Sequence, residues 1–127
     1  MIDHVSIAVS DLERSTAFYE QVLAPLGYQR LVMRDHTVGF GRKYPEFWIN
    51  YRPNMGPIAD DSGLHVCLRC TTVEAVQAFH EAALGCGGRD GGAPGPRQAS
   101  MTSYYAAFIR DPDGNRIEAA TFPASAP

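Results

Sequence analysis

The chain has 127 residues, of which 45% are hydrophobic and 20% are charged, and its formal net charge is −3 at pH 7. This balance is ordinary for one globular domain with a core of its own, and it excludes a wholly disordered chain. We find no basic stripe of the kind that binds nucleic acid, and no apolar run near the ~20 residues that span a membrane. Because the N-terminus also lacks the segments of a signal peptide, we expect a cytoplasmic protein.

The sequence repeats itself at an offset of 61 residues, which places His4 on His65. The alignment continues without a gap, and identical residues recur at matched positions: Glu13 with Glu74, Ala17 with Ala78, Phe18 with Phe79, and Gly27 with Gly88. A repeat of this length predicts two copies of one structural module.

In chain order, each copy begins with an alternating apolar strand that is followed by an amphipathic helix. The strands are expected at residues 2–9 and 64–70 and the helices at 11–24 and 72–84. Ser10-Asp11 and Thr71-Thr72 stand before the helices, where their side-chain oxygens can cap unpaired amides. Glycines follow both helices and end them.

Three short strands are expected after the first helix, at residues 28–34, 37–41 and 46–51. The second helix is followed by the glycine- and proline-rich segment 85–103, in which we expect one short strand near 88–91 and otherwise a long loop. Such a loop is either a functional lid or a surface connection, and the sequence leaves both open.

A hairpin closes the domain, with strands at 104–110 and 115–121 around a turn that contains Pro112 and Gly114. We therefore predict an α+β fold of two tandem βαβββ modules, whose curled mixed sheet surrounds a cleft with the helices outside. The expected division is module one at 1–52, a linker at 53–61, module two at 62–121 and a tail at 122–127.

Cys67 and Cys70 form a C-x-x-C within a predicted strand. Residues three apart on a strand point to opposite faces, so this pair is not suited to chelate one metal or to form a redox disulfide. The total of three cysteines also argues against a disulfide framework. We interpret them as small hydrophobic residues.

The two matched histidines are the strongest candidates for metal ligands. On the first strand, Val5 and its apolar neighbours face the helix, while His4 and Ser6 share the other face. The repeated strand places His65 and Arg69 on the equivalent face. Two imidazoles at matched positions, brought towards a shared cleft by pseudo-twofold symmetry, favour a metal site over two unrelated structural histidines.

Glu118 lies in the last predicted strand, where a buried carboxylate is costly unless a cation or a salt bridge compensates it. If the hairpin pairs Arg110 with Asn115, then Tyr105 shares the face of Glu118 and becomes a candidate acid or hydrogen-bond donor. The turn geometry decides this register. The alternative for Tyr105 is a position in the aromatic core.

These features together resemble the vicinal oxygen chelate superfamily, which includes glyoxalase I, extradiol dioxygenases, and the bleomycin- and fosfomycin-resistance proteins. The resemblance covers His4 to Ala120 and rests on three segments: Asp3-His4-Val5-x-Ile7-x-Val9, Asp11-Leu12-x-x-Ser15-x-x-Phe18-Tyr19, and Asp111-Pro112-Asp113-Gly114-Asn115-x-Ile117-Glu118. It implies metal ligands at His4, His65 and Glu118 and a protein that is often completed by dimerisation.

The fourth ligand position of glyoxalase I falls on Trp48, which cannot bind a metal. Two histidines and one carboxylate remain, the set that extradiol dioxygenases use for Fe(II). Those enzymes also need a further histidine, and neither His36 nor His80 is placed to provide it.

The resemblance implies a metal-dependent lyase, isomerase or extradiol-type dioxygenase that binds two adjacent oxygens of a small substrate to a divalent ion. The sequence does not choose among Fe, Mn, Zn and Ni. Candidate substrate contacts are Ser6, Trp48, Asn50, Arg69 and Tyr105. The alternative is a non-catalytic protein of the bleomycin-resistance type, which sequesters a small molecule. In either case we expect a homodimer and a small-molecule ligand.

Overall fold

The two copies of the repeat fold into two four-stranded mixed sheets with equivalent strand orders, β1-β4-β3-β2 and β5-β8-β7-β6. This computed structural model describes residues 1–99 and 101–122, so most of the predicted tail lies outside the described residues. The first module contains β1 (Val5–Val9), α1 (Leu12–Leu23), the 3-10 turn η1 (Ala24–Leu26), β2 (Gln29–Met33), β3 (Thr37–Gly41) and β4 (Phe47–Tyr51). The second contains β5 (Val66–Cys70), α2 (Val73–Gly85), β6 (Arg89–Gln98), β7 (Ser103–Arg110) and β8 (Arg116–Thr121).

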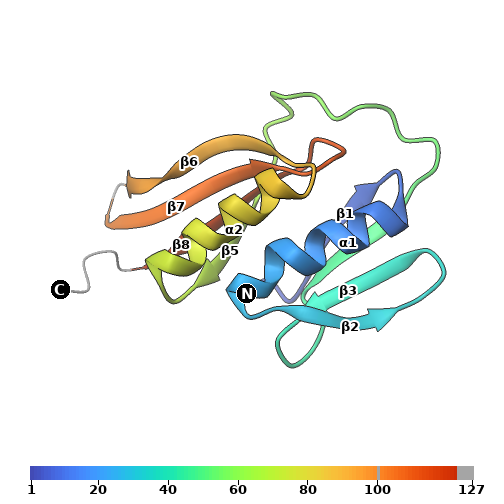
Figure 1. Ribbon diagram of the computed structural model, residues 1–127, viewed down its shortest axis with the longest axis horizontal. Helices are drawn as coiled ribbons and strands as arrows, with labels where there is room; N and C mark the ends of the chain where they lie inside the picture. Colours follow the sequence, from blue (N-terminus) through green and yellow to red (C-terminus); the bar gives the residue numbers. More distant parts are fainter. Residues whose placement is uncertain (100, 123–127) are drawn as a thin grey trace.

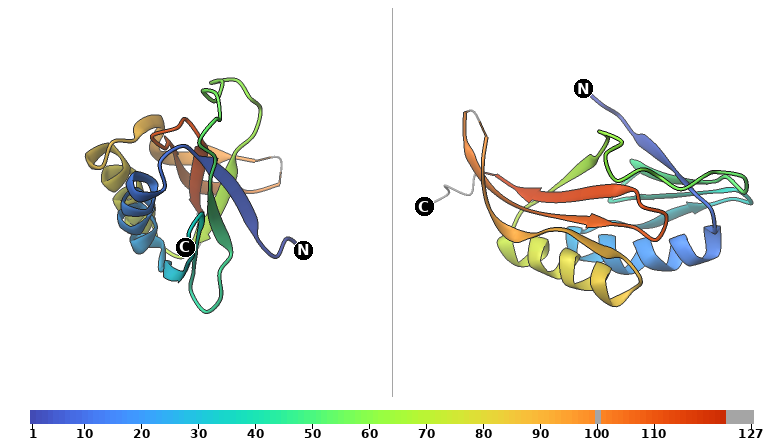
Figure 2. Two further views of the ribbon diagram at one scale, coloured as in Figure 1. Left: turned by 90° about the vertical axis from the view of Figure 1, so that its right-hand side faces the viewer. Right: turned by 90° about the horizontal axis from the view of Figure 1, so that it is seen from above.

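Both helices lie on the same side of the two sheets and pack against each other (Figures 1 and 2). Their starts are capped as predicted, because the Asp11 side chain accepts from the Arg14 amide and Thr72 accepts from the Ala75 amide. One face of each sheet is therefore covered by helices, and the opposite face of each sheet, called here the open face, points away from them.

The core between the helices and the sheets is one cluster that includes residues of both modules. The matched phenylalanines Phe18 and Phe79 are both fully or almost fully buried. The apolar face of β1 contributes Ile7 and Val9, as the alternation predicted. The two modules therefore pack as one unit, since a single hydrophobic cluster contains residues of both.

The glycine- and proline-rich segment differs from its prediction. Instead of a short strand near 88–91 and a loop, β6 runs over ten residues from Arg89 to Gln98 and pairs with β7. The register shifts between Asp90 and Gly92 and again between Gly92 and Gly95. The strand signal was hidden because such irregularities accommodate glycine and proline, which are otherwise rare inside strands.

The β7–β8 hairpin also differs from its predicted register by one residue. Arg110 pairs with Arg116, not with Asn115, and Glu118 lies opposite Phe108. The Asp111 carboxylate fixes this turn, because its Oδ1 accepts from the amides of Asp113 and Asn115. A shift of one residue exchanges the two faces of a strand, and this changes the composition of the site.

Candidate functional site

The open face of the second sheet holds a paired histidine and glutamate. His65 stands just before β5, and Glu118 lies on the adjacent strand β8, opposite Cys67. The His65 Nε2 atom is 3.0 Å from Glu118 Oε1. The Glu118 side chain is only 5% exposed, whereas that of His65 is 39% exposed. A nearly buried carboxylate is thus paired with an imidazole that solvent can reach.

Aromatic contacts surround this pair. The Phe108 ring lies edge-on to the His65 ring, with 5.3 Å between their centroids. The Arg116 guanidinium stacks 4.1 Å from the centre of the same Phe108 ring. Phe108 therefore limits the rotation of His65 and shields Glu118 from water. The sequence did not identify Phe108, because its place beside Glu118 depends on the hairpin register.

The thiol of Cys67 is the nearest further polar group on this face. Burial of part of the side chain and the adjacent Glu118 carboxylate raise the pKa of Cys67 to about 12. The thiol is therefore protonated and unreactive at neutral pH. Cys70, on the opposite face of β5, is buried. The two cysteines take opposite faces of β5 as predicted, but Cys67 is exposed, so only Cys70 fits the interpretation as a small buried hydrophobic residue.

The open face of the first sheet has Trp48 at the position that matches Glu118. Trp48 pairs with Ser6 across the parallel β1–β4 ladder, just as Glu118 pairs with Cys67 across β5–β8. A cavity of about 430 Å³ lies over this face and is lined by Asp3, His4, Ser6, Arg34, Thr37, Tyr44, Pro45 and Trp48. The Arg34 guanidinium lies 5.5 Å from the centre of the Trp48 ring.

His4 lines this first cavity and does not join the pair on the second sheet. Its Nδ1 is 2.8 Å from the Asp3 carboxylate, and both side chains are largely exposed. Within residues 1–99 and 101–122 of a single chain, no group of three His, Cys, Asp or Glu side chains is arranged to hold a metal ion. The expected convergence of His4, His65 and Glu118 is therefore not found among the described residues of one chain.

Tyr105 is not on the face of Glu118, so its predicted face is wrong, and it packs against the core as in the alternative. It pairs with Thr121 on the helix side of the sheet, and its hydroxyl accepts a hydrogen bond from Gln77 of α2. The one-residue register difference accounts for the exchange. Tyr104 takes the open face in its place and stacks on Phe122.

The remaining candidate contacts are distributed over both sheets. Ser6 lines the first cavity. Asn50 accepts a hydrogen bond of 2.6 Å from the Thr37 hydroxyl. Arg69 lies near the far end of β5, where its guanidinium stacks on Phe122. The structure therefore brings Ser6 and Trp48 together with His4, but Arg69 belongs to another part of the surface.

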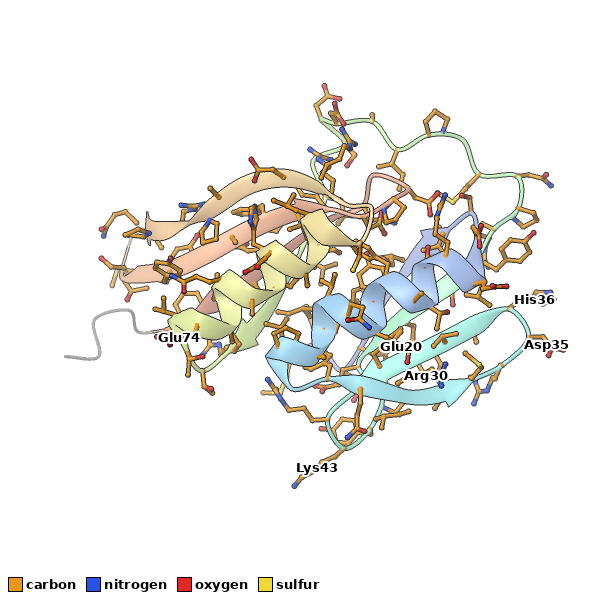
Figure 3. All side chains as sticks on the ribbon, viewed as in Figure 1. Glu20, Arg30, Asp35, His36, Lys43 and Glu74 are labelled. Atoms are coloured by element: carbon orange, nitrogen blue, oxygen red, sulfur yellow. The ribbon has the colours of Figure 1, made fainter. Side chains whose placement is uncertain are left out.

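The two other histidines lie away from the His65–Glu118 pair, as expected. His36 is at the turn between β2 and β3, at the outer end of the first module (Figure 3), where it stacks on Tyr51. His80 is on α2 and binds the Asp90 carboxylate at 2.8 Å.

Comparison with known proteins identifies the family. Residues 1–119 match the Glyoxalase/Bleomycin resistance protein/Dioxygenase superfamily, and the chain belongs to it. A glyoxalase/bleomycin resistance protein from Albidiferax ferrireducens T118 is 32% identical, with a TM-score of 0.83 over 94% of this chain and 97% of that one.

Two more distant structures share the fold. A glyoxalase I mutant from Zea mays has a TM-score of 0.71 at 23% identity, over 93% of this chain and 44% of that one. The fosfomycin resistance protein FosX from Listeria monocytogenes has a TM-score of 0.68 at 14% identity, over 98% and 94%. No match was found among curated protein sequences. None of the described helices is long and apolar enough to cross a membrane.

Proposed function

We propose that this chain is a metal-dependent enzyme of the glyoxalase or dioxygenase type, acting in the cytoplasm on a small substrate with two adjacent oxygens. In this proposal His65 and Glu118 of one chain and His4 of a second copy bind one divalent ion. The observation that carries the proposal is the His65–Glu118 pair, because a nearly buried carboxylate beside an accessible imidazole is a combination that a cation stabilises.

The geometry of the pair fits two ligands of one ion. Ligand nitrogen and oxygen atoms lie about 2.1 Å from a small divalent metal, so two atoms that bind one ion must be less than about 4.2 Å apart. The distance between His65 Nε2 and Glu118 Oε1 is 3.0 Å. Phe108 already restricts His65 and thereby reduces the entropy cost of binding. A divalent ion held here supplies a Lewis acid that polarises two substrate oxygens.

A second copy supplies the third ligand in this arrangement. Both open faces point away from the helices (Figure 2), so a twofold-related chain can lay its first sheet over the second sheet of its partner. The same rotation places the partner's second sheet over the first sheet of the original chain, as an isologous dimer requires. Each of two identical sites then combines His65 and Glu118 of one chain with His4 and Trp48 of the other.

Metal analysis tests the ligand set. Protein purified without chelator is expected to contain about one Zn, Fe, Mn or Ni ion per chain, and His65→Ala and Glu118→Ala should lose it. His36→Ala is the matched control and should keep its metal, because His36 stacks on Tyr51 away from the pair. Metal content that is unchanged in both site variants would contradict the proposal.

A mixing experiment tests whether the site is shared between chains. His4→Ala and His65→Ala should each lack metal and activity when alone. When equal amounts are unfolded together and refolded, random pairing restores about one quarter of the sites, since half of the dimers are mixed and each has one complete site. Mixtures that recover no metal would place the site within a single chain.

A sequestering function without catalysis is the second candidate, and Trp48 favours it. Its ring has the position of the missing fourth ligand, and with Tyr44 it lines a cavity large enough for a planar molecule. A protein that binds aromatic ligands equally well after chelator treatment, with Trp48 fluorescence quenched, would support sequestration over metal chemistry.

A further inference from the structure

A second cavity lies at the junction of the two modules, away from the His65–Glu118 pair. Its volume is about 520 Å³, and neither His65 nor Glu118 lines it. Its wall combines η1, the turn after β3, the end of β5 and the residues that follow β5. The lining includes Arg42, Arg69, Thr71, Thr72 and Phe122. The cavity is thus built by both halves of the chain.

Two guanidinium groups border this cavity, and its described lining contains no Asp or Glu; that of Arg42 also lies 5.0 Å from the centre of the Tyr28 ring. Arg42 Nη2 donates to the carbonyls of Leu26, at 2.8 Å, and Arg69, at 3.3 Å. Arg69 stacks on Phe122. Among residues 1–99 and 101–122, neither arginine forms an ion pair with an acidic side chain, although Arg14 and Arg30 do. Two neighbouring positive charges without a counter-charge favour binding of an anion.

At the equivalent place in the first module, beside Ser10, a carboxylate of the protein, that of Asp113, is bound. Asp113 accepts from both the amide and the hydroxyl of Ser10 and pairs with Arg14 at 3.2 Å. Its side chain is only 8% exposed. In the repeat, Ser10 corresponds to Thr71. The corresponding turn, between β3 and β4, contributes Arg42 to the cavity, and its Glu46 is not among the described residues that line the cavity with Thr71. The second module keeps a hydroxyl at Thr71 but has Ala75 where the first module has Arg14, so the positive charge at this cavity comes from Arg42 and Arg69 instead.

We propose that this junction cavity is a binding site for a small oxyanion, either a carboxylate or a phosphate group. Arg42 and Arg69 provide charge, and the Thr71 hydroxyl donates a hydrogen bond, as Ser10 does to Asp113. Guanidinium groups bind both kinds of oxyanion, because their paired N–H groups match two oxygens of either. The site goes beyond the proposed metal chemistry and does not depend on it.

The test is a titration of the full chain with inorganic phosphate and, separately, with acetate, at constant ionic strength. Saturable shifts of the Thr71 and Arg69 signals in two-dimensional NMR spectra are expected with at least one of the two anions, and comparison of the two titrations decides between phosphate and carboxylate. Arg69→Gln should weaken binding about tenfold, the value of a charge-assisted hydrogen bond.

Arg89→Gln is the matched control, because it removes the same charge from a side chain that is 63% exposed and lies outside the cavity. It should bind within about twofold of the original chain, as expected for a screened distant charge. Arg42→Lys keeps the charge but loses the paired N–H groups, and it too should weaken binding. Lack of saturation by both anions, or equal losses in Arg69→Gln and Arg89→Gln, would overturn the proposal.

Discussion

The two modules keep the same packing but differ in their open faces. Phe18 and Phe79 are buried at matched positions, and both helices begin with a side-chain cap. On the open faces, however, Glu118 of the second module corresponds to Trp48 of the first. The two modules therefore share buried core positions and helix caps, but they carry different side chains at this matched position of the open faces.

A second difference concerns how each helix is tied to the rest of the molecule. Tyr19 on α1 donates a hydrogen bond of 2.7 Å to Asp111 in the other module. Its counterpart in the repeat is His80 on α2, which binds the partly exposed Asp90 of its own module. The first helix is thus held to the other module, whereas the second is held to β6 of its own module.

The largest expected effect comes from the matched core phenylalanines. Phe18→Ala and Phe79→Ala should each lower the free energy of unfolding by about 3–5 kcal/mol, because both create large cavities in one shared core. Urea unfolding followed by fluorescence, which reports on Trp48 in the first module, should coincide with unfolding followed by circular dichroism. Separate transitions would show that the modules unfold independently, contrary to the single core.

The two hydrogen bonds that hold the helices, Tyr19 to Asp111 and His80 to Asp90, should contribute different amounts to stability. Tyr19→Phe keeps the ring but removes a hydrogen bond to a carboxylate that is almost fully buried, and a loss of about 1–3 kcal/mol in unfolding free energy is expected. His80→Phe should cost less, since Asp90 remains hydrated when its partner is removed. The two variants are compared by urea denaturation at pH 7. A larger loss of unfolding free energy in His80→Phe than in Tyr19→Phe would contradict the proposal that Tyr19 makes the stronger of the two hydrogen bonds.

Trp48→Glu tests whether the open faces are equivalent. A carboxylate at this position would stand where Glu118 stands in the other module, and in the proposed dimer it adds a ligand to the ion. Metal affinity should therefore rise about tenfold by competition with a chromogenic chelator, about 1.4 kcal/mol. Trp48→Gln, which adds no charge, is the control. Equal affinities in both variants would mean that the first sheet does not reach the metal.

The smallest expected effect is on the pH dependence of stability, to which Asp90 and Asp111 should contribute with opposite signs. The hydrogen bond from His80 lowers the pKa of Asp90, so the stability from this group is present above the usual aspartate pKa and is lost as the pH falls through the lowered value. Burial raises the pKa of Asp111, so its contribution is present below the usual pKa and is lost as the pH rises through the raised value.

Unfolding curves recorded between pH 3 and pH 7 check these signs. Asp90→Asn should be slightly less stable than the original chain at neutral pH, and the difference should disappear towards acid. A difference that grows towards acid would contradict the lowered pKa of Asp90.

The sequence predicted most of the architecture because the repeat and the helical caps are local signals. Strand alternation placed His65 on the face opposite the apolar core, and the family resemblance, not the alternation, associated Glu118 with it; the structure brings their side chains to 3.0 Å. The sequence could not place Tyr105, because the hairpin register depends on how Asp111 binds the turn amides. Nor could it show that His4 lies apart from the pair, because the relative placement of two sheets is a tertiary property.

The irregular strand β6 has a consequence for how copies of this chain can associate. It is the outermost strand of the second sheet, and it contains Pro94 and Pro96, which have no backbone N–H to offer to an incoming strand. Extension of this sheet by another chain is therefore blocked at that border. The dimer proposed above would therefore form through the broad surfaces of the sheets, where side chains select the partner, and not through backbone pairing at β6.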